Sequence, residues 1–169
     1  ALLSCKDQGY VQKIGISIYD PSELEEILDR YPIDLVQAPF SVIDRRLERT
    51  SSLNKSCWLD RLHESGVEIH VRSIFLQGLL LMELNQRPEK FSRWNDLWSE
   101  WDTWLEDNHI SALKACLNFA LSYKQIDRIV VGVDSLSHLE GILENIEGNL
   151  PVTPSSLISN DSNLLNPFC

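Results

Sequence analysis

Three aspartates follow stretches that are expected to form strands, namely Asp20, Asp44 and Asp134. Carboxylates that meet at one edge of a sheet could act as general acid and base. Aspartate is also common as a helix cap, where its side chain accepts a hydrogen bond from a backbone N–H. Both interpretations fit these positions, so we predict no acid–base catalysis from them.

The histidines and cysteines do not predict a metal site. Three histidines show no metal-ligand spacing: His63, His109 and His138. His70 is expected to point outward from its strand. The four cysteines lack CxxC spacing, so we expect reduced thiols, with Cys116 and Cys57 on buried helix faces.

Composition describes a globular chain and excludes two classes of partner. Of 169 residues, 43% are hydrophobic and 24% are charged, and the formal net charge is −10. An acidic surface repels phosphate backbones, so we expect no nucleic-acid binding. No apolar stretch approaches the roughly 18 residues of a membrane span. The N-terminus has no signal-peptide pattern, and we expect a cytoplasmic protein that does not bind membranes.

Alternating strands and helices would position these side chains. Short β-branched runs predict four strands, at residues 13–18, 33–37, 67–73 and 128–133. Helical spacing of apolar residues predicts helices at 21–30, 53–65, 91–106, 111–123 and 136–146. This alternation is typical of a parallel sheet flanked by helices, an α/β fold. A whole (β/α)₈ barrel takes about 250 residues, so the chain is too short for one.

The helix predicted at 91–106 carries an apolar stripe at helical spacing. Its members are Trp94, Leu97, Trp98, Trp101 and Leu105. Such a stripe is far more often packed in a core than used to bind a ligand. We therefore predict that these tryptophans pack.

Four segments together resemble the second half of the aldo-keto reductase family. Residues 13–20 (KIGISIYD) resemble the family's fifth strand, and residues 33–45 (IDLVQAPFSVIDR) its sixth strand and the following loop. Residues 66–80 (GVEIHVRSIFLQGLL) resemble the seventh strand, and residues 129–140 (IVVGVDSLSHLE) the eighth. The resemblance implies the C-terminal half of a TIM-type (β/α)₈ barrel over residues 1–148, followed by an irregular tail at 149–169.

The family transfers hydride from NADPH to a small-molecule carbonyl substrate, with catalytic Tyr, Lys, Asp and His on its first four strands. The resemblance begins at strand five, so it assigns no catalytic residue here and implies a cofactor-side half. Ser17 and Gln37 match positions that bind the nicotinamide amide, and Arg72 replaces the tyrosine that stacks on its ring. Ser73 matches a pyrophosphate contact, and a loop would cover it, with Phe75, Gln77 and Gly78 as its cofactor-binding residues.

The positions that match the adenosine-phosphate site are Gly132, Ser135, His138 and Ile142. Ser135 and His138 are the candidates, because Ser135 can cap a helix whose N-terminal N–H groups favour phosphate. No Arg or Lys is nearby, so NADP is expected from the family and NAD is an alternative.

Other interpretations of these residues stay open. Ser17 and Gln37 could satisfy backbone groups, and Arg72 could pair with Asp20 or Asp134. The chain could be part of a longer enzyme that supplies the missing N-terminal half-barrel, or a non-catalytic half-barrel module that pairs with a second copy. Loops at 38–51 and 81–92 would shape the substrate pocket.

Overall fold

The computed structural model describes residues 1–50 and 56–166, which form two compact units. Unit 1 comprises Ala1–Pro39, Arg46–Arg72 and Lys124–Val130, and unit 2 comprises Phe40–Arg45, Ser73–Tyr123 and Val131–Cys169. Parts of three predictions lie outside the described residues. They are residues 53–55 of the helix predicted at 53–65, residue 51 of the loop predicted at 38–51, and Cys169 among the predicted reduced thiols. No helix within the described ranges is long and apolar enough to cross a membrane.

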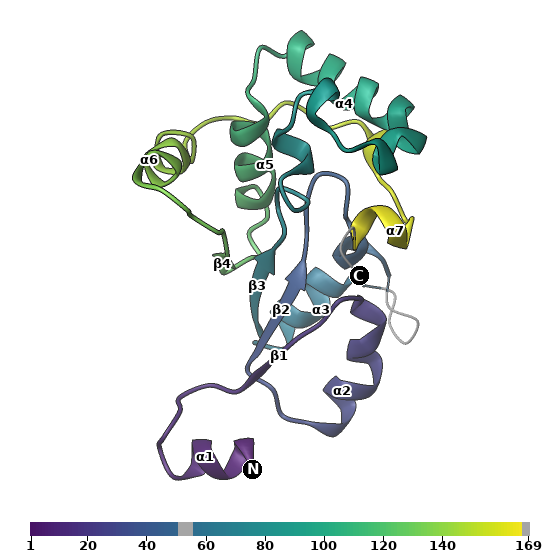
Figure 1. Cartoon of the computed structure of the whole chain (residues 1–169). Helices are drawn as coiled ribbons and strands as arrows, with labels where there is room; N and C mark the ends of the chain where they lie inside the picture. The colour runs from purple at the N-terminus through teal and green to yellow at the C-terminus, as the bar shows by residue number, and fades with distance from the viewer. Residues whose placement is uncertain (51–55, 167–169) are drawn as a thin grey trace. The chain divides into compact units, whose positions relative to one another are not determined.

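Unit 1 contains a four-stranded parallel sheet, as the alternation of strands and helices predicts (Figure 1). The strands are β1 (Gly15–Ser17), β2 (Leu35–Pro39), β3 (Glu68–Arg72) and β4 (Arg128–Ile129), and they lie in this order. Each is shorter than or shifted from its predicted range, but all four exist. Its helical elements are α1 (Leu2–Asp7), η1 (Pro21–Glu23), α2 (Leu24–Arg30), η2 (Arg46–Glu48) and α3 (Trp58–Glu64).

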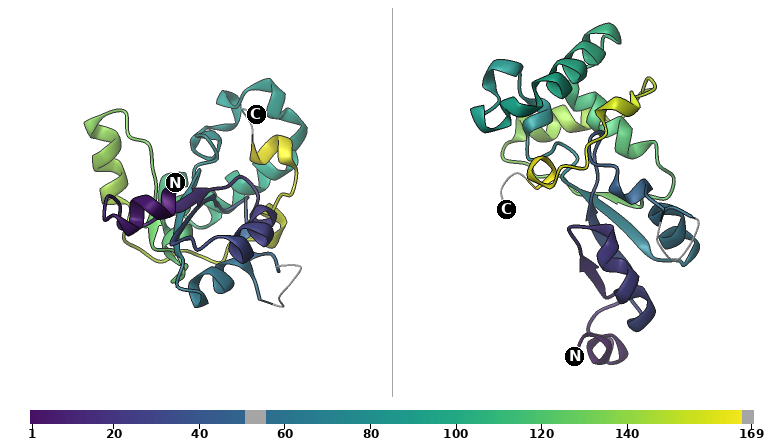
Figure 2. Two further views of the ribbon diagram at one scale, coloured as in Figure 1. Left: turned by 90° about the horizontal axis from the view of Figure 1, so that it is seen from below. Right: turned by 90° about the vertical axis from the view of Figure 1, so that its right-hand side faces the viewer.

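The two faces of the sheet differ in chemistry. Helices α2 and α3 lie on the same side of the sheet (Figure 2). Side chains alternate between faces along a strand, and Ile69 and Val71 of β3 are fully buried on the face against which α3 packs. His70 and Arg72 therefore lie on the opposite, partly exposed face. His70, which was predicted to point outward from its strand, is half-buried and shares its face of β3 with Arg72.

Carboxylates and a glycine fix the strands at their N-terminal ends. Asp34 accepts hydrogen bonds from Lys6 (2.6 Å) and from the backbone N–H of Ile14 (2.9 Å). The Lys6 ammonium and this N–H together lower the pKa of the Asp34 carboxyl. Gly15 passes so close to Leu35 that an added Cβ would lie 2.4 Å from the Leu35 carbonyl oxygen. β1 therefore needs glycine at this position in order to pair with β2.

Asp20 acts as a helix cap. Its carboxylate accepts from the backbone N–H of Ser22 (2.9 Å), while Glu23 accepts from the backbone N–H of Asp20 (2.7 Å). This reciprocal pair begins the predicted 21–30 helix as the short η1 turn that leads into α2. Arg46 adds an ion pair at 3.2 Å. Burial opposes ionisation, but the bonds from Ser22 and the charge of Arg46 lower the pKa of Asp20 overall.

Unit 2 is built from helices and short turns. They are η3 (Leu79–Leu81), η4 (Leu84–Gln86), η5 (Glu89–Trp94), α4 (Asn95–Asp107), α5 (Ala112–Leu121), α6 (Leu136–Glu144), η6 (Ser155–Leu157) and α7 (Ser162–Leu165). The predicted 91–106 helix is thus η5 followed by α4. The segment after Gly148 contains η6 and α7, whose leucines 157, 164 and 165 are buried.

The predicted packing of Trp98 and Trp101 is found in α4, whereas Trp94 is half-buried and Trp104, outside the predicted stripe, packs as well. Trp98, Trp101 and Trp104 are buried. Each indole N–H donates to a backbone carbonyl of another segment: Trp98 to Phe91 (2.9 Å), Trp101 to Leu80 (3.1 Å) and Trp104 to Val152 (3.1 Å). A buried indole keeps its N–H satisfied in this way, so α4 joins three segments of unit 2.

Helix α6 differs from the other α-helices of unit 2 because none of its residues is buried. Its apolar side chains Leu139 and Leu143 are exposed. It contacts α5, where Asn118 donates to the Asn145 carbonyl at 2.9 Å. Within unit 2, the apolar face of α6 is therefore largely uncovered.

Candidate functional site

Unit 1 brings two of the predicted nicotinamide-binding residues together. Ser17 and Gln37 are register partners on β1 and β2, and the Ser17 hydroxyl donates to the Gln37 amide oxygen at 3.3 Å. Both line a shallow cavity of about 320 Å³. The Gln37 amide N–H groups remain available as donors and the Ser17 oxygen as an acceptor. The pair therefore complements a planar carboxamide, which carries one acceptor and one donor group.

Arg72 lies two residues beyond His70 on the same face of β3. Its guanidinium donates to the Ile18 carbonyl at 3.2 Å and lies 4.8 Å from the centre of the Tyr19 ring. Tyr19, which is 56% exposed, was not among the predicted site residues. Tyr19 lies two residues after Ser17, just beyond the end of β1. This spacing was the sequence signal that could have identified it.

A charged group lies on the same face of the sheet, nearer the N-terminal end of β3. Glu68 contacts the Lys13 ammonium and the His70 ring, whose Nε2 is 2.8 Å from the carboxylate. The bonds from Lys13 and His70 lower the pKa of Glu68 to about 2. Glu68 is thus an anion at neutral pH, and we assign it a structural role because these two partners engage both of its oxygens.

The segment 73–78 of unit 2 has an unusual backbone. Ser73, Leu76 and Gln77 adopt left-handed conformations, with φ values of 58°, 47° and 57°, before Gly78 at 89°. A non-glycine residue in this region costs about 1–2 kcal/mol. The turn is closed by bonds from the N–H of Leu76 to Ser73 (2.8 Å) and from that of Gly78 to Phe75 (2.9 Å). Buried Ile74 and Leu76 anchor it. Strain of this kind is concentrated at functional loops.

Ser135 caps α6 as predicted. Its hydroxyl accepts from the backbone N–H of His138 at 3.2 Å and lies 2.9 Å from the Ser137 hydroxyl. The His138 side chain is exposed. The first turn of α6 carries no acidic side chain, although the exposed Asp134 directly precedes the cap.

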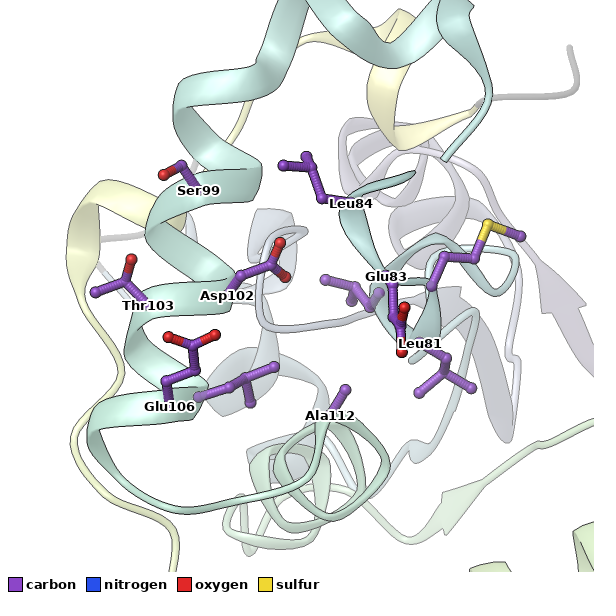
Figure 3. Close-up of a pocket in the computed structure, with 11 residues that line it drawn as sticks. Leu81, Glu83, Leu84, Ser99, Asp102, Thr103, Glu106 and Ala112 are labelled. Atoms are coloured by element: carbon purple, nitrogen blue, oxygen red, sulfur yellow. The ribbon is translucent and has the colours of Figure 1, made fainter. Parts of the chain in front are cut away.

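A larger cavity lies elsewhere in unit 2, between η3, η4 and α4 (Figure 3). Its volume is about 550 Å³. The ionisable groups among its lining residues are Glu83, Asp102 and Glu106, and Ser99 and Thr103 add hydroxyls. Carboxylates repel phosphate, so this cavity does not suit a dinucleotide, and none of the predicted cofactor residues lines it.

The three aspartates that follow strands do not form one cluster within either unit. Asp20 is a cap in unit 1, whereas Asp44 and Asp134 belong to unit 2, where Asp44 is buried and Asp134 is exposed. Among the described residues, no group of His, Cys, Asp and Glu side chains could hold a metal ion.

Comparisons with known proteins bear on the family and the fold of this chain. The family model of the aldo/keto reductase family matches residues 1–156. The holo form of the aldo-keto reductase AKR11C1 from Bacillus halodurans matches with a TM-score of 0.66 and 21% identity, over 89% of this chain and 49% of that one. The glycerol dehydrogenase AKR11B4 from Gluconobacter oxydans matches with a TM-score of 0.64 and 14% identity, over 89% and 48%. A comparison with curated proteins finds no match.

The structural matches show a shared fold, because their sequence identities are low. The chain spans about half the length of the solved aldo-keto reductases that it matches. Four parallel strands with flanking helices are what half of a (β/α)₈ barrel contains. The family model, in contrast, covers most of the chain at the level of sequence. The chain belongs to the aldo/keto reductase family.

Proposed function

We propose that this chain is the C-terminal, cofactor-binding half of an NAD(P)H-dependent aldo-keto reductase that reduces a small carbonyl compound. The observation that carries the proposal is the Ser17–Gln37 pair, which presents a donor and an acceptor to one cavity of unit 1. In barrels of this kind the working residues lie at the carboxyl ends of the strands. Ser17 ends β1, and Gln37 is its register partner.

A nicotinamide cofactor would supply the hydride, and this chain's residues would bind and orient it. The Gln37 amide would donate to the carboxamide oxygen, and the Ser17 hydroxyl would accept from the carboxamide N–H. We propose the strained 73–78 segment, with Ser73, Phe75, Gln77 and Gly78, as the pyrophosphate loop. We assign none of this chain's residues to the family's catalytic Tyr, Lys, Asp and His.

Ser135 and His138 are proposed to bind the adenosine phosphate at the beginning of α6, where N–H groups favour an anion. The matched positions Gly132 and Ile142 offer no cation. Discrimination between NADP and NAD would then rest on the cap and on His138, so NADP is the first expectation and NAD the alternative. We propose that the protein is located in the cytoplasm.

The test is calorimetric titration of the purified chain with NADPH and NADH. We expect binding of at least one of them, and Ser17→Ala should weaken it roughly 3–10-fold, because one hydrogen bond is lost. Ser65→Ala is the matched control, since Ser65 is an exposed serine at the end of α3 whose hydroxyl donates to the Arg61 carbonyl. A folded chain that binds neither nucleotide contradicts the proposal. Reading the coding sequence upstream of Ala1 then shows whether the family's four catalytic residues precede it.

A second candidate is a non-catalytic half-barrel that pairs with a second copy of itself. The exposed Leu139 and Leu143 of α6 favour it, because an uncovered apolar face needs a partner. Residues 1–148 would form the half-barrel and residues 149–169 a tail. Analytical ultracentrifugation separates the candidates: a dimer without nucleotide binding supports the module, and a nucleotide-binding monomer contradicts it.

A further inference from the structure

The acidic cavity of unit 2 lies between two walls (Figure 3). One wall is α4, and the other is the segment that runs from η3 to η4. Ala112, the first residue of α5, also lines the cavity. The volume of about 550 Å³ falls within the range of roughly 300–1,000 Å³ that is usual for small-molecule sites. The cavity is therefore large enough for a small organic ligand.

Two buried contacts join the walls and fix the distance between them. The indole N–H of Trp101, on α4, donates to the Leu80 carbonyl of η3 at 3.1 Å. Arg87, directly after η4, donates to both carboxylate oxygens of Asp102 on α4, at 2.8 and 2.6 Å. The Trp101 side chain is fully buried and that of Arg87 is 3% exposed. The cavity is therefore part of the folded unit and does not depend on a ligand to form.

Apolar side chains supply much of the lining. Six of the eleven lining residues are apolar, and Leu81, Met82 and Leu84 come from the wall that faces α4. Leu81 and Leu84 remain 42% and 54% exposed. Apolar side chains that are exposed beside a cavity are characteristic of a binding surface. A ligand with an apolar body would cover these two leucines.

Carboxylates stand on both walls of the same cavity. Glu83 comes from the segment between η3 and η4, whereas Asp102 and Glu106 come from α4 (Figure 3). Arg87 balances the charge of Asp102. Within residues 1–50 and 56–166, the side chains of Glu83 and Glu106 make no ion pair or hydrogen bond, and no Lys, Arg or His is among the lining residues. Two uncompensated negative charges therefore border an apolar surface.

We propose that this cavity binds an organic cation, in which an ammonium group is attached to an apolar body. The ammonium group would lie near the carboxylates of Glu83 and Glu106, and the apolar body would pack on Leu81 and Leu84. The net charge of −10 favours the approach of a cation and disfavours that of an anion. The proposal is independent of the nucleotide site, because none of the proposed cofactor residues lines this cavity.

The experiment is calorimetric titration of the full chain with octylammonium chloride, in the absence of nucleotide. We expect one molecule to bind per chain. Two unit charges about 4 Å apart in water change an affinity about fivefold. Neutral 1-octanol should therefore bind at least about fivefold more weakly, and anionic octanoate should not bind detectably. Butylammonium, which has four methylene groups fewer, should bind at least about tenfold more weakly.

Variants separate the contribution of charge from that of apolar contact. Glu83→Gln and Glu106→Gln should each weaken octylammonium binding about fivefold and leave 1-octanol binding unchanged. Leu84→Ser should weaken the binding of both ligands. All three side chains are exposed, so the variants should fold, and circular dichroism checks this.

Asp107→Asn is the matched control for charge. Asp107 is the next residue of α4 after Glu106, but it lines a neighbouring hollow rather than this cavity. The variant loses the same net charge as Glu106→Gln, and its affinity for octylammonium should change less than about twofold, because the charge is removed outside the cavity.

Four results would overturn the proposal. They are no octylammonium binding by the folded chain, octanoate binding as tight as that of octylammonium, equal effects of Glu106→Gln and Asp107→Asn, and an unchanged affinity in both Glu83→Gln and Leu84→Ser. An acetylated peptide of alternating leucine and lysine tests the competing occupant, a basic protein segment. If this peptide binds more tightly than octylammonium and is weakened by the same variants, the cavity is a protein-docking site and the small-molecule proposal is wrong.

Discussion

The buried ion pair between Arg87 and Asp102 predicts an asymmetric response to mutation. The Arg87 guanidinium donates to both Asp102 oxygens (2.8 and 2.6 Å) and to the Leu79 carbonyl (3.3 Å), and it lies 4.9 Å from the Trp98 ring. The Arg87 side chain is 3% exposed, whereas that of Asp102 is 30% exposed. Removing Asp102 therefore leaves a buried cation, but removing Arg87 leaves a carboxylate that water can reach.

The magnitudes follow from this difference in exposure. Breaking a fully buried pair by removing one partner costs about 3–5 kcal/mol. Since water reaches Asp102, we expect about 2–3 kcal/mol for Asp102→Asn. Arg87→Met replaces the guanidinium by an unbranched apolar side chain and should cost about 1–2 kcal/mol. The double variant should cost at least about 1 kcal/mol less than the sum of the single variants.

Urea unfolding followed by tryptophan fluorescence measures these free energies, because Trp98 and Trp101 are buried in the same unit. Arg93→Met is the matched control: Arg93 also stacks on a tryptophan, Trp94, and pairs with Asp161 at 3.2 Å, but it is 53% exposed. It should cost less than about 0.5 kcal/mol. The reasoning is refuted if Asp102→Asn costs no more than this control, or if the two single costs add.

Three further predictions concern other parts of the chain. Gly15→Ala should destabilise unit 1 by more than about 2 kcal/mol in urea unfolding, because its Cβ would collide with the Leu35 backbone 2.4 Å away; a neutral effect contradicts the β1–β2 pairing. Glu68 has its pKa lowered from 4.5 to about 2, so its contribution to stability is present above pH 4.5 and is lost as the pH falls toward 2. Glu68→Gln should flatten the pH dependence of the urea midpoint between pH 4.5 and 2. An unchanged slope would show that Lys13 does not stabilise the Glu68 carboxylate. Burial raises the pKa of the Cys116 thiol, so iodoacetamide at pH 7.5 should modify it only after unfolding, as peptide mass spectrometry will show; rapid native labelling contradicts its burial.

Local patterns in the sequence were sufficient for the elements and the family. Alternating β-branched residues predicted four parallel strands, because burial on one face of a strand repeats every two residues. The helical spacing of Trp98 and Trp101 predicted packing, which the structure confirms. Ser135 was predicted as a cap from its position before a helix, and its hydroxyl does accept from the His138 N–H.

Tertiary structure decided which side chains share a face and which meet across strands. The contact between Tyr19 and Arg72 joins residues 53 positions apart (72 − 19), and it depends on the register of three strands. The left-handed backbone of the 73–78 segment could not be predicted from the sequence either, because Ser73, Leu76 and Gln77 do not favour positive φ on their own. Surrounding packing imposes it. Sequence periodicity therefore determined the elements, and the resemblance of four segments indicated the family. Strand register and burial determined the geometry of the site, since these depend on contacts between distant residues.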